Sequence, residues 1–231
     1  AAIDVVEIEP AVVKAARFFD TAHHHALDDP RVTLFETDGR TFLAAKRKPY
    51  DVIVSGVSDP WISGVSNLFT VDYFRQLASR LTERGVAAIW LQNYRVSEPE
   101  LKTMLRTVAE AFGHVSLWHD GRGISDLFVM ASNAPLVVDY KALQHYLGSA
   151  ERAPSLRGHG VNDAFDVLQM FLAGDGDVRK FAAGAELNSD NRPVLEFTLP
   201  FQQYRKVDRS GGERMGRLLA MSQQIHPAMS N

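Results

Sequence analysis

The sequence predicts an α/β fold in which a mostly parallel sheet is closed by an antiparallel hairpin. Strand-like and helix-like segments alternate through residues 3–112, a pattern typical of right-handed βαβ units with helices on both faces of a parallel sheet. The rhythm changes at 114–120 (HVSLWHD) and 124–132 (ISDLFVMAS), two strand-like runs separated by GRG. Such a short connection indicates a hairpin, which adds one antiparallel strand to the sheet.

The predicted elements begin at once. IDVVEIEP at residues 3–10 has the pattern of a buried parallel strand that runs directly into a helix. With no turn before this strand, we expect an N-terminal strand and a glycine turn of the fold to be missing from the sequence. The strands are expected at 3–8, 31–36, 50–55 and 86–91, and the helices at 10–20, 39–47, 70–83 and 97–112.

The pattern is less regular beyond Pro135. We expect a mostly helical extension at 136–204, and a tail at 205–231 that is solvated or forms a frayed helix. Residues 1–135 would then form the first domain, which contains the sheet. Within the extension the expected elements are a helix at 138–148, a loop at 151–160, one or two helices in 161–184 split by GDGD, and a short strand at 194–198.

Composition excludes several classes of function. The 231 residues carry a net charge of -3, so we expect neither nucleic acid nor an anionic membrane surface as a partner, and a small molecule is favoured. The absence of cysteine rules out disulfides, thiolate nucleophiles and thiolate metal sites. No apolar run reaches the length of a membrane span and no signal-peptide pattern opens the chain, which favours a soluble chain.

Two carboxylates follow successive predicted strands. Glu7 ends the first strand, where ligands of doubly wound sheets bind, and could accept hydrogen bonds from a ribose diol. Glu9 precedes Pro10 and is better explained as a helix-entry residue. Asp38, followed by Gly39, ends the next strand, where it could bind an adenine amine, cap the following helix, or do both.

Together the two acids favour one adenosine ligand. The closing hairpin is unusual for nicotinamide-binding folds, so the combination points to an S-adenosyl sulfonium compound. No G-x-G-x-x-G motif occurs, and a phosphate-binding turn is therefore not predicted.

Three ordered motifs carry a family resemblance. They are VVEIEP at 5–10, DDPRVTLFETDGRTFL at 28–43 and YDVIVSGVSDPWISGVSNLFT at 50–70, and LNSDNRPVLEF at 187–197 adds to them. They resemble the spermidine synthase family of polyamine aminopropyltransferases, most of all bacterial spermidine synthase-like proteins, some of which are fused to membrane transporter segments. The resemblance implies a Rossmann-like S-adenosylmethionine-dependent transferase sheet, a homodimer, and a cytoplasmic protein or the soluble part of a membrane-anchored one.

The resemblance also implies a reaction and a cofactor site. The family transfers an aminopropyl group from decarboxylated S-adenosylmethionine, which acts as co-substrate, to a diamine such as putrescine, without a metal. The residues implied for cofactor binding are Glu7, Ile8, Asp38, Gly39 and Ser55.

The loop after the third predicted strand would hold the amine. An alkyl ammonium group loses its proton only near pH ~10, so a carboxylate must orient the amine and assist its deprotonation. The family places two aspartates here, three residues apart. The later one is Asp59, followed by Pro60, but Gly56 stands where the family has its base. Asp59 is thus the implied catalytic and amine-binding residue, unless it forms only an Asp-Pro turn.

Gln92 matches a second substrate-binding position of the family. The acid expected two residues later is replaced by Tyr94, so a second carboxylate is lost. Ser55 and Ser58 are neutral hydrogen-bond partners. Two lost acids argue against efficient use of a dicationic amine, because a buried ammonium needs a paired charge.

Two other hypotheses remain open. The chain could be an S-adenosylmethionine-dependent methyltransferase with another acceptor, or a non-catalytic assembly or regulatory module that keeps the fold. The run HHH at 23–25 suggests a metal site, but adjacent side chains point in different directions and no cluster has ligand spacing, so we expect no metal.

Overall fold

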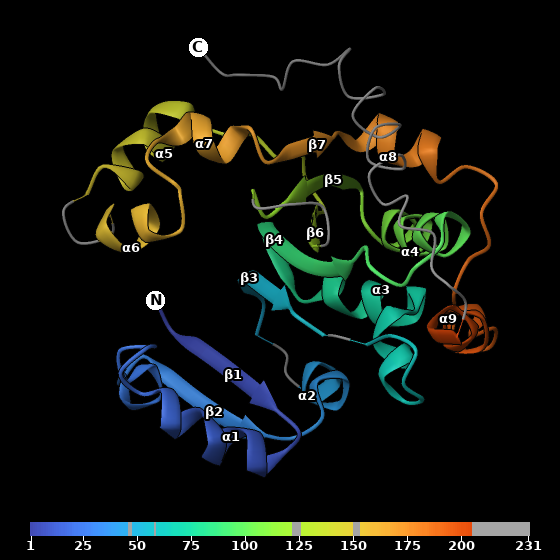
Figure 1. The fold of residues 1–231 in the computed structure, drawn as a ribbon, viewed down its shortest axis with the longest axis horizontal. Coiled ribbons are helices and arrows are strands. Elements are labelled where there is room, and N and C mark those ends of the chain that lie inside the picture. Colours follow the sequence, from blue (N-terminus) through green and yellow to red (C-terminus); the bar gives the residue numbers. More distant parts are fainter. Residues whose placement is uncertain (46–47, 58, 122–125, 150–152, 205–231) are drawn as a thin grey trace. The chain divides into compact units, whose positions relative to one another are not determined.

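The computed structural model describes residues 1–45, 48–57, 59–121, 126–149 and 153–204. These residues form two compact units, 1–48 and 49–231, which are described separately. The α/β class and the closing hairpin are confirmed (Figure 1). Within the described ranges, no helix is both long and apolar enough to cross a membrane.

The first unit is a small βαβ layer. Its strands β1 (Ile3–Glu7) and β2 (Val32–Glu36) pair in parallel, and its helix α1 (Pro10–Ala16) begins at a proline. The short 3-10 helices η1 (Arg17–Phe19) and η2 (Ala26–Asp28) follow, and α2 (Gly39–Ala45) comes after β2. The α2 side chains Phe42 and Leu43 are the buried apolar residues of this unit among those described, so its core is thin.

The second unit contains a five-stranded sheet in the order β3-β4-β6-β5-β7. The strand β3 pairs in parallel with β4, whereas β6 pairs antiparallel with both β4 and β5. The strands are β3 (Tyr50–Ser55), β4 (Leu81–Gln92), β5 (His114–His119), β6 (Asp126–Ser132) and β7 (Phe171–Ala173).

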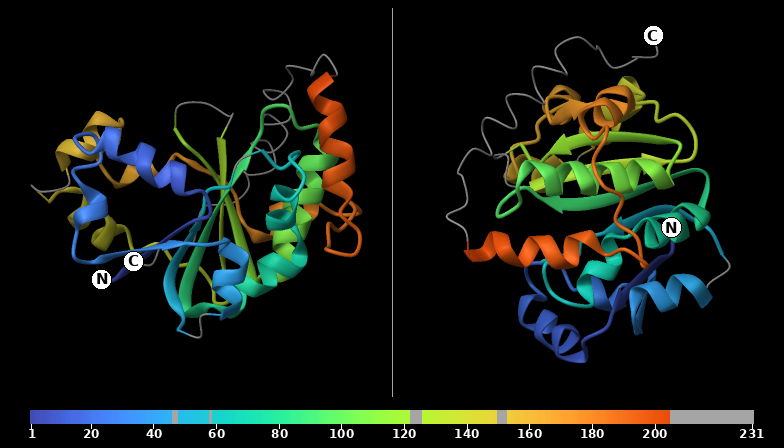
Figure 2. Two further views of the ribbon diagram at one scale, coloured as in Figure 1. Left: turned by 90° about the horizontal axis from the view of Figure 1, so that it is seen from below. Right: turned by 90° about the vertical axis from the view of Figure 1, so that its right-hand side faces the viewer.

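Helices cover one face of this sheet. The alternating β4 and β6 residues Ile89, Leu91, Leu127 and Val129 are at most 1% exposed and belong to that face. Figure 2 shows α3, α4 and α9 along it. The helices of the unit are α3 (Val71–Ser79), α4 (Glu98–Ala111), α5 (Tyr140–Leu147), α6 (Ala153–Gly158), α7 (Ala164–Leu168), α8 (Asp175–Phe181) and α9 (Val194–Tyr204), and η3 (Val65–Phe69) precedes α3.

Four predicted elements differ from the structure. The strand expected at 194–198 lies in α9: Leu195 and Leu199, one helical turn apart, are fully buried, whereas a strand would put Phe197, which is 67% exposed, on the same face as both. The loop expected at 151–160 contains α6, and β7 interrupts the helices expected at 161–184. The helix expected at 70–83 ends at Ser79, since β4 already begins at Leu81.

The predicted boundary at residue 135 remains a prediction. Beyond it, β7 pairs with β5 of the sheet and α8 packs beside α4, so the segment contributes to the second unit. The tail predicted at 205–231 lies outside the described residues.

Candidate active site

Glu7 and Asp38 lie at the same end of one parallel strand pair. Glu7 is the last residue of β1 and is in register with Glu36 at the end of β2, two residues before Asp38. The backbone N–H of Thr37 donates to the Glu7 carbonyl over 3.0 Å, which holds the two strand ends together. The first unit therefore brings the two carboxylate-bearing residues to one edge of its sheet.

Both carboxylates accept hydrogen bonds from nearby backbone groups. The Glu7 Oε1 atom accepts from the N–H of Glu9 over 2.9 Å, and Asp38 Oδ1 accepts from the N–H of Thr41 over 2.7 Å. Asp38 thus caps α2, as one of its two predicted roles required. Glu9 accepts from the Ala11 N–H and is the N-cap of α1, which confirms its predicted helix-entry role.

The neighbouring residues implied for cofactor binding are accessible. Ile8 is 65% exposed, and a Cβ atom added at Gly39 would meet nothing within 4 Å. Exposure shows that a ligand can reach these residues, not that one binds. The roles predicted for Glu7, Ile8, Asp38 and Gly39 therefore remain predictions.

The loop after β3 has an unusual backbone at Asp59. Its φ angle is 59°, in the left-handed region, although Pro60 follows and disfavours helical conformations for the preceding residue. The Asp59 carbonyl accepts from the N–H of Ile62 over 2.9 Å, so the Asp-Pro turn is present. Residues held in sparsely populated conformations occur preferentially at functional sites.

Long-range contacts hold this loop in place. Gln92, 1% exposed at the end of β4, accepts a hydrogen bond from the N–H of Asp59 on Oε1 over 3.3 Å. On the far side of the loop, Ser63 and Ser66 donate to the two carboxylate oxygens of Glu196 in α9 over 2.9 and 3.3 Å. No local sequence pattern indicates the Glu196 contact, because 133 residues separate Glu196 from Ser63.

The serines and the glycine of the loop differ in burial. Ser55 is buried, and its hydroxyl lies 3.3 Å from the Tyr73 hydroxyl, which occupies one of its hydrogen-bonding directions. Gly56 is exposed, and a Cβ atom there would meet nothing within 4 Å. Ser58 lies outside the described residues.

Polar side chains gather where β4 ends. Gln92 Nε2 donates to the Tyr94 carbonyl over 3.5 Å, and Trp90 Nε1 donates to Asp126 Oδ1 over 2.9 Å. Burial makes the largest contribution to raising the pKa of Tyr94. The negative charges of Asp59 and Asp126 raise this pKa further, while Arg95 opposes the shift. Asp59, Asp126 and Tyr94 are therefore close enough to interact electrostatically.

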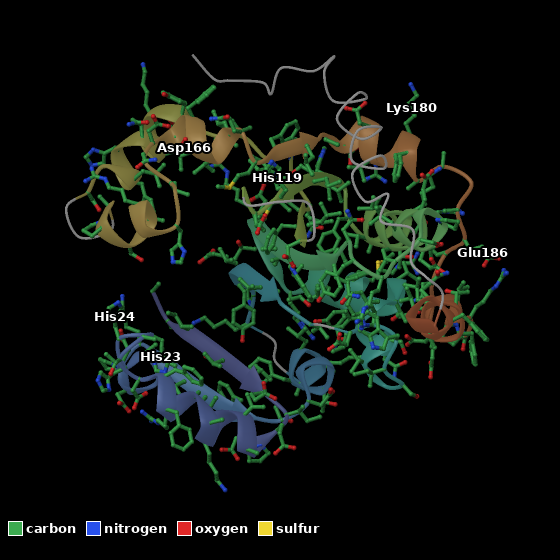
Figure 3. The ribbon with its side chains drawn as sticks, in the orientation of Figure 1. His23, His24, His119, Asp166, Lys180 and Glu186 are labelled. Carbon is green, nitrogen blue, oxygen red and sulfur yellow. The ribbon has the colours of Figure 1, made fainter. Side chains whose placement is uncertain are left out.

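His23 and His25 contact groups of their own segment. His23 bonds to the Ala16 carbonyl through Nε2 and accepts from the Ala26 N–H on Nδ1, so both of its ring nitrogens are used locally. His23 Nε2 also lies 3.3 Å from Asp20 Oδ1. Ligand atoms of Asp20, His25 and Asp28 lie within 4.8 Å of one another, and Arg17 already pairs with Asp28. Figure 3 labels His23 and His24 in the first unit and His119 in the second.

Several known proteins are similar to parts of this chain. A polyamine aminopropyltransferase of Clostridium perfringens is 37% identical over 84 residues, 36% of this chain and 29% of that protein. The enzyme of the same name from Nitrosomonas europaea is 30% identical over 112 residues, 48% of this chain and 34% of its own length. Putrescine N-methyltransferase 2 of Nicotiana tabacum is 36% identical over 102 residues, 42% of this chain and 29% of its own.

Solved structures share the fold. A probable spermidine synthase from Corynebacterium glutamicum superposes with a TM-score of 0.54 at 23% identity, covering 81% of this chain and 63% of that one. A spermidine synthase in complex with the transition state analogue AdoDATO gives a TM-score of 0.54 at 16% identity, covering 95% and 61%.

The matches cover enough of this chain to assign its family, but only part of the relatives' length. The chain spans about a third of the length of the curated relatives it matches, and under two thirds of these two structures. The family model described as the spermine/spermidine synthase domain, however, matches residues 1–118, half of the chain. The chain therefore belongs to the spermine/spermidine synthase family.

Proposed function

We propose that the protein transfers an aminopropyl group from decarboxylated S-adenosylmethionine to an amine such as putrescine. The observation that carries this proposal is the loop after β3: Asp59 is held in a left-handed conformation, and its N–H is bound by the buried Gln92. Both residues stand where the resemblance to the family implies amine binding, and the family membership supports the reaction type.

In the proposed reaction, a neutral amine nitrogen attacks the carbon beside the sulfonium. The new C–N bond forms as the C–S bond breaks, the electron pair of that bond stays on sulfur in methylthioadenosine, and the nitrogen loses one proton. Asp59 orients the amine and acts as the general base that accepts the proton the nitrogen loses. Because Gly56 carries no base, we propose that transfer is slower than in relatives with both aspartates.

The donor would be bound at the strand ends of the first unit. Glu7 accepts hydrogen bonds from the ribose and Asp38 from the adenine, with Ile8 and Gly39 lining the site in this proposal. No metal takes part. We also propose a homodimer, as the family resemblance implies, which light scattering would test.

Methyl transfer to an amine is a second candidate. It is favoured by the similarity to putrescine N-methyltransferase 2, which is as close in identity as the aminopropyltransferases. Both reactions use the same attack of an amine on a carbon bound to sulfonium sulfur, so they differ in the donor and not in the acceptor site.

A product assay separates the possibilities. The protein is incubated with putrescine and either donor, and the products are identified by mass spectrometry. We expect methylthioadenosine and spermidine from the decarboxylated donor. S-adenosylhomocysteine with methylputrescine would instead establish the second candidate. No product, together with no binding of either donor in calorimetry, would overturn both and leave a non-catalytic module.

A further inference from the structure

Asp126 is a second carboxylate beside Gln92. In the antiparallel pairing of β4 with β6, Gln92 lies directly opposite Asp126 and Trp90 opposite Phe128. Directly opposite residues project from the same face of a sheet with Cβ atoms about 5 Å apart. The Asp126 side chain therefore shares a sheet face with the amide that binds the Asp59 loop.

A hydrogen bond fixes Asp126 on that face. Trp90 Nε1 donates to Asp126 Oδ1 over 2.9 Å, a diagonal contact between neighbouring strands. The adjacent residues Leu91 and Leu127 point to the opposite, helix-covered face and are fully buried. Asp126 itself is half-buried, so it is oriented by the sheet yet within reach of solvent.

Asp126 and Asp59 both interact with Gln92 and with Tyr94. Gln92 connects them, since its backbone pairs with Asp126 and its side chain accepts from the Asp59 N–H. Both carboxylates also raise the pKa of Tyr94, whose side chain is 41% exposed beside them. Arg95 is a cation nearby and opposes that shift as the smallest contribution.

We propose that Asp126 binds the second cationic group of a diamine acceptor, so that Asp59 and Asp126 together select a dication. The inference rests on the proposed function, because it specifies the acceptor of the same site. Asp126 would also replace the negative charge that is missing at Gly56 and Tyr94. A desolvated ammonium is stable only beside a paired anion, and Asp126 supplies one from a strand far along the chain. In this proposal Asp126 compensates for the two lost acids, which otherwise argue against the use of a dicationic amine.

Kinetics with two amines test the selection. Putrescine and 1-aminobutane have the same carbon chain but two and one ammonium groups. Asp126→Asn should raise the KM for putrescine about tenfold, since one charge-assisted contact is lost, and leave that for 1-aminobutane unchanged. Asp51→Asn is the matched control, because Asp51 lies at the opposite end of the sheet and accepts from Thr82 Oγ1. Equal effects on both amines, or none, would overturn the proposal.

A binding measurement separates this inference from the proposed reaction. The indole N–H proton of Trp90, assigned with Trp90→Phe, reports on Asp126 by NMR without turnover. Putrescine should shift this signal in the wild type and shift it much less in Asp126→Asn. If the shift occurs but no product forms with either donor, the reaction fails and the diamine site stands. If wild-type protein shows no shift, the diamine site fails even where transfer is observed.

Discussion

The strand ends of the two units are built by different kinds of contact. In the first unit, Glu7 and Asp38 are bound by backbone groups two and three residues away. In the second, Asp59 depends on Gln92, 33 residues away, and its loop on Glu196 in α9. Local contacts form with little loss of chain entropy, whereas distant ones require the whole unit to fold.

This difference has a consequence for function. A carboxylate held by backbone groups two or three residues away needs few other contacts, so the proposed donor residues tolerate the thin core of the first unit. The amine loop contains a strained residue, and strain persists only where the surroundings over-determine it. Amine binding should therefore respond to distant substitutions in the second unit, while donor binding responds to local ones.

The largest expected effect comes from restoring a base at Gly56. An added side chain meets nothing within 4 Å and the backbone there is not left-handed, so Gly56→Asp should fold normally. Since general base catalysis contributes about a hundredfold or more, transfer to putrescine at neutral pH should rise by about that factor. Steady-state kinetics measure it, with Gly56→Asn as the control of equal size and no base. Equal rates in the two variants would contradict the assignment of this position.

Donor binding offers the next largest effect. Glu7→Gln keeps an oxygen that can accept from the Glu9 N–H but removes the charge proposed to hold the ribose. Affinity for methylthioadenosine, measured by calorimetry, should fall about tenfold, because a charge-assisted hydrogen bond becomes a neutral one. Glu9→Gln should leave the affinity unchanged, since Glu9 caps α1. The ribose role is lost if both variants bind like the wild type.

The same contrast explains how much the sequence could predict. Segments with a clear local pattern were found: β3 has the predicted bounds 50–55, and α4 lies within the predicted 97–112. The helix caps at Glu9 and Asp38 were also predicted, because a cap depends on a few adjacent residues.

What the sequence could not predict depends on distant packing. The run VLEFT has strand-forming residues, but it lies in α9, where Leu195 and Leu199 are buried and Phe197 is exposed. Asp126 was missed since only the β4–β6 register places it opposite Gln92, and no motif encodes that register. The sequence pattern shows Asp126 only as an acidic residue near the start of the second hairpin strand.

Glu196 provides a smaller effect on the amine loop alone. Glu196→Gln replaces one of the oxygens that accept from Ser63 and Ser66, so the loop should be held less firmly. We expect the KM for putrescine to rise about threefold, the loss of one modest hydrogen bond, with unchanged affinity for methylthioadenosine. Glu186→Gln is the control, because Glu186 pairs with Arg192 at the surface. A weakened donor affinity would show that long-range contacts also support the donor site.

The smallest effect is a shift in the titration of Tyr94. Burial and the charges of Asp59 and Asp126 raise its pKa above 10.0, so Asp59→Asn and Asp126→Asn should each lower it, Asp59→Asn by more. NMR of the tyrosine Cζ carbons against pH, assigned with Tyr94→Phe, measures the shift. The folded state holds this proton more tightly than the unfolded state, so the stability contributed by Tyr94 is complete below pH ~10 and is lost as the pH rises through the folded pKa. An unchanged pKa in Asp126→Asn would place Asp126 too far away to share an amine with Asp59.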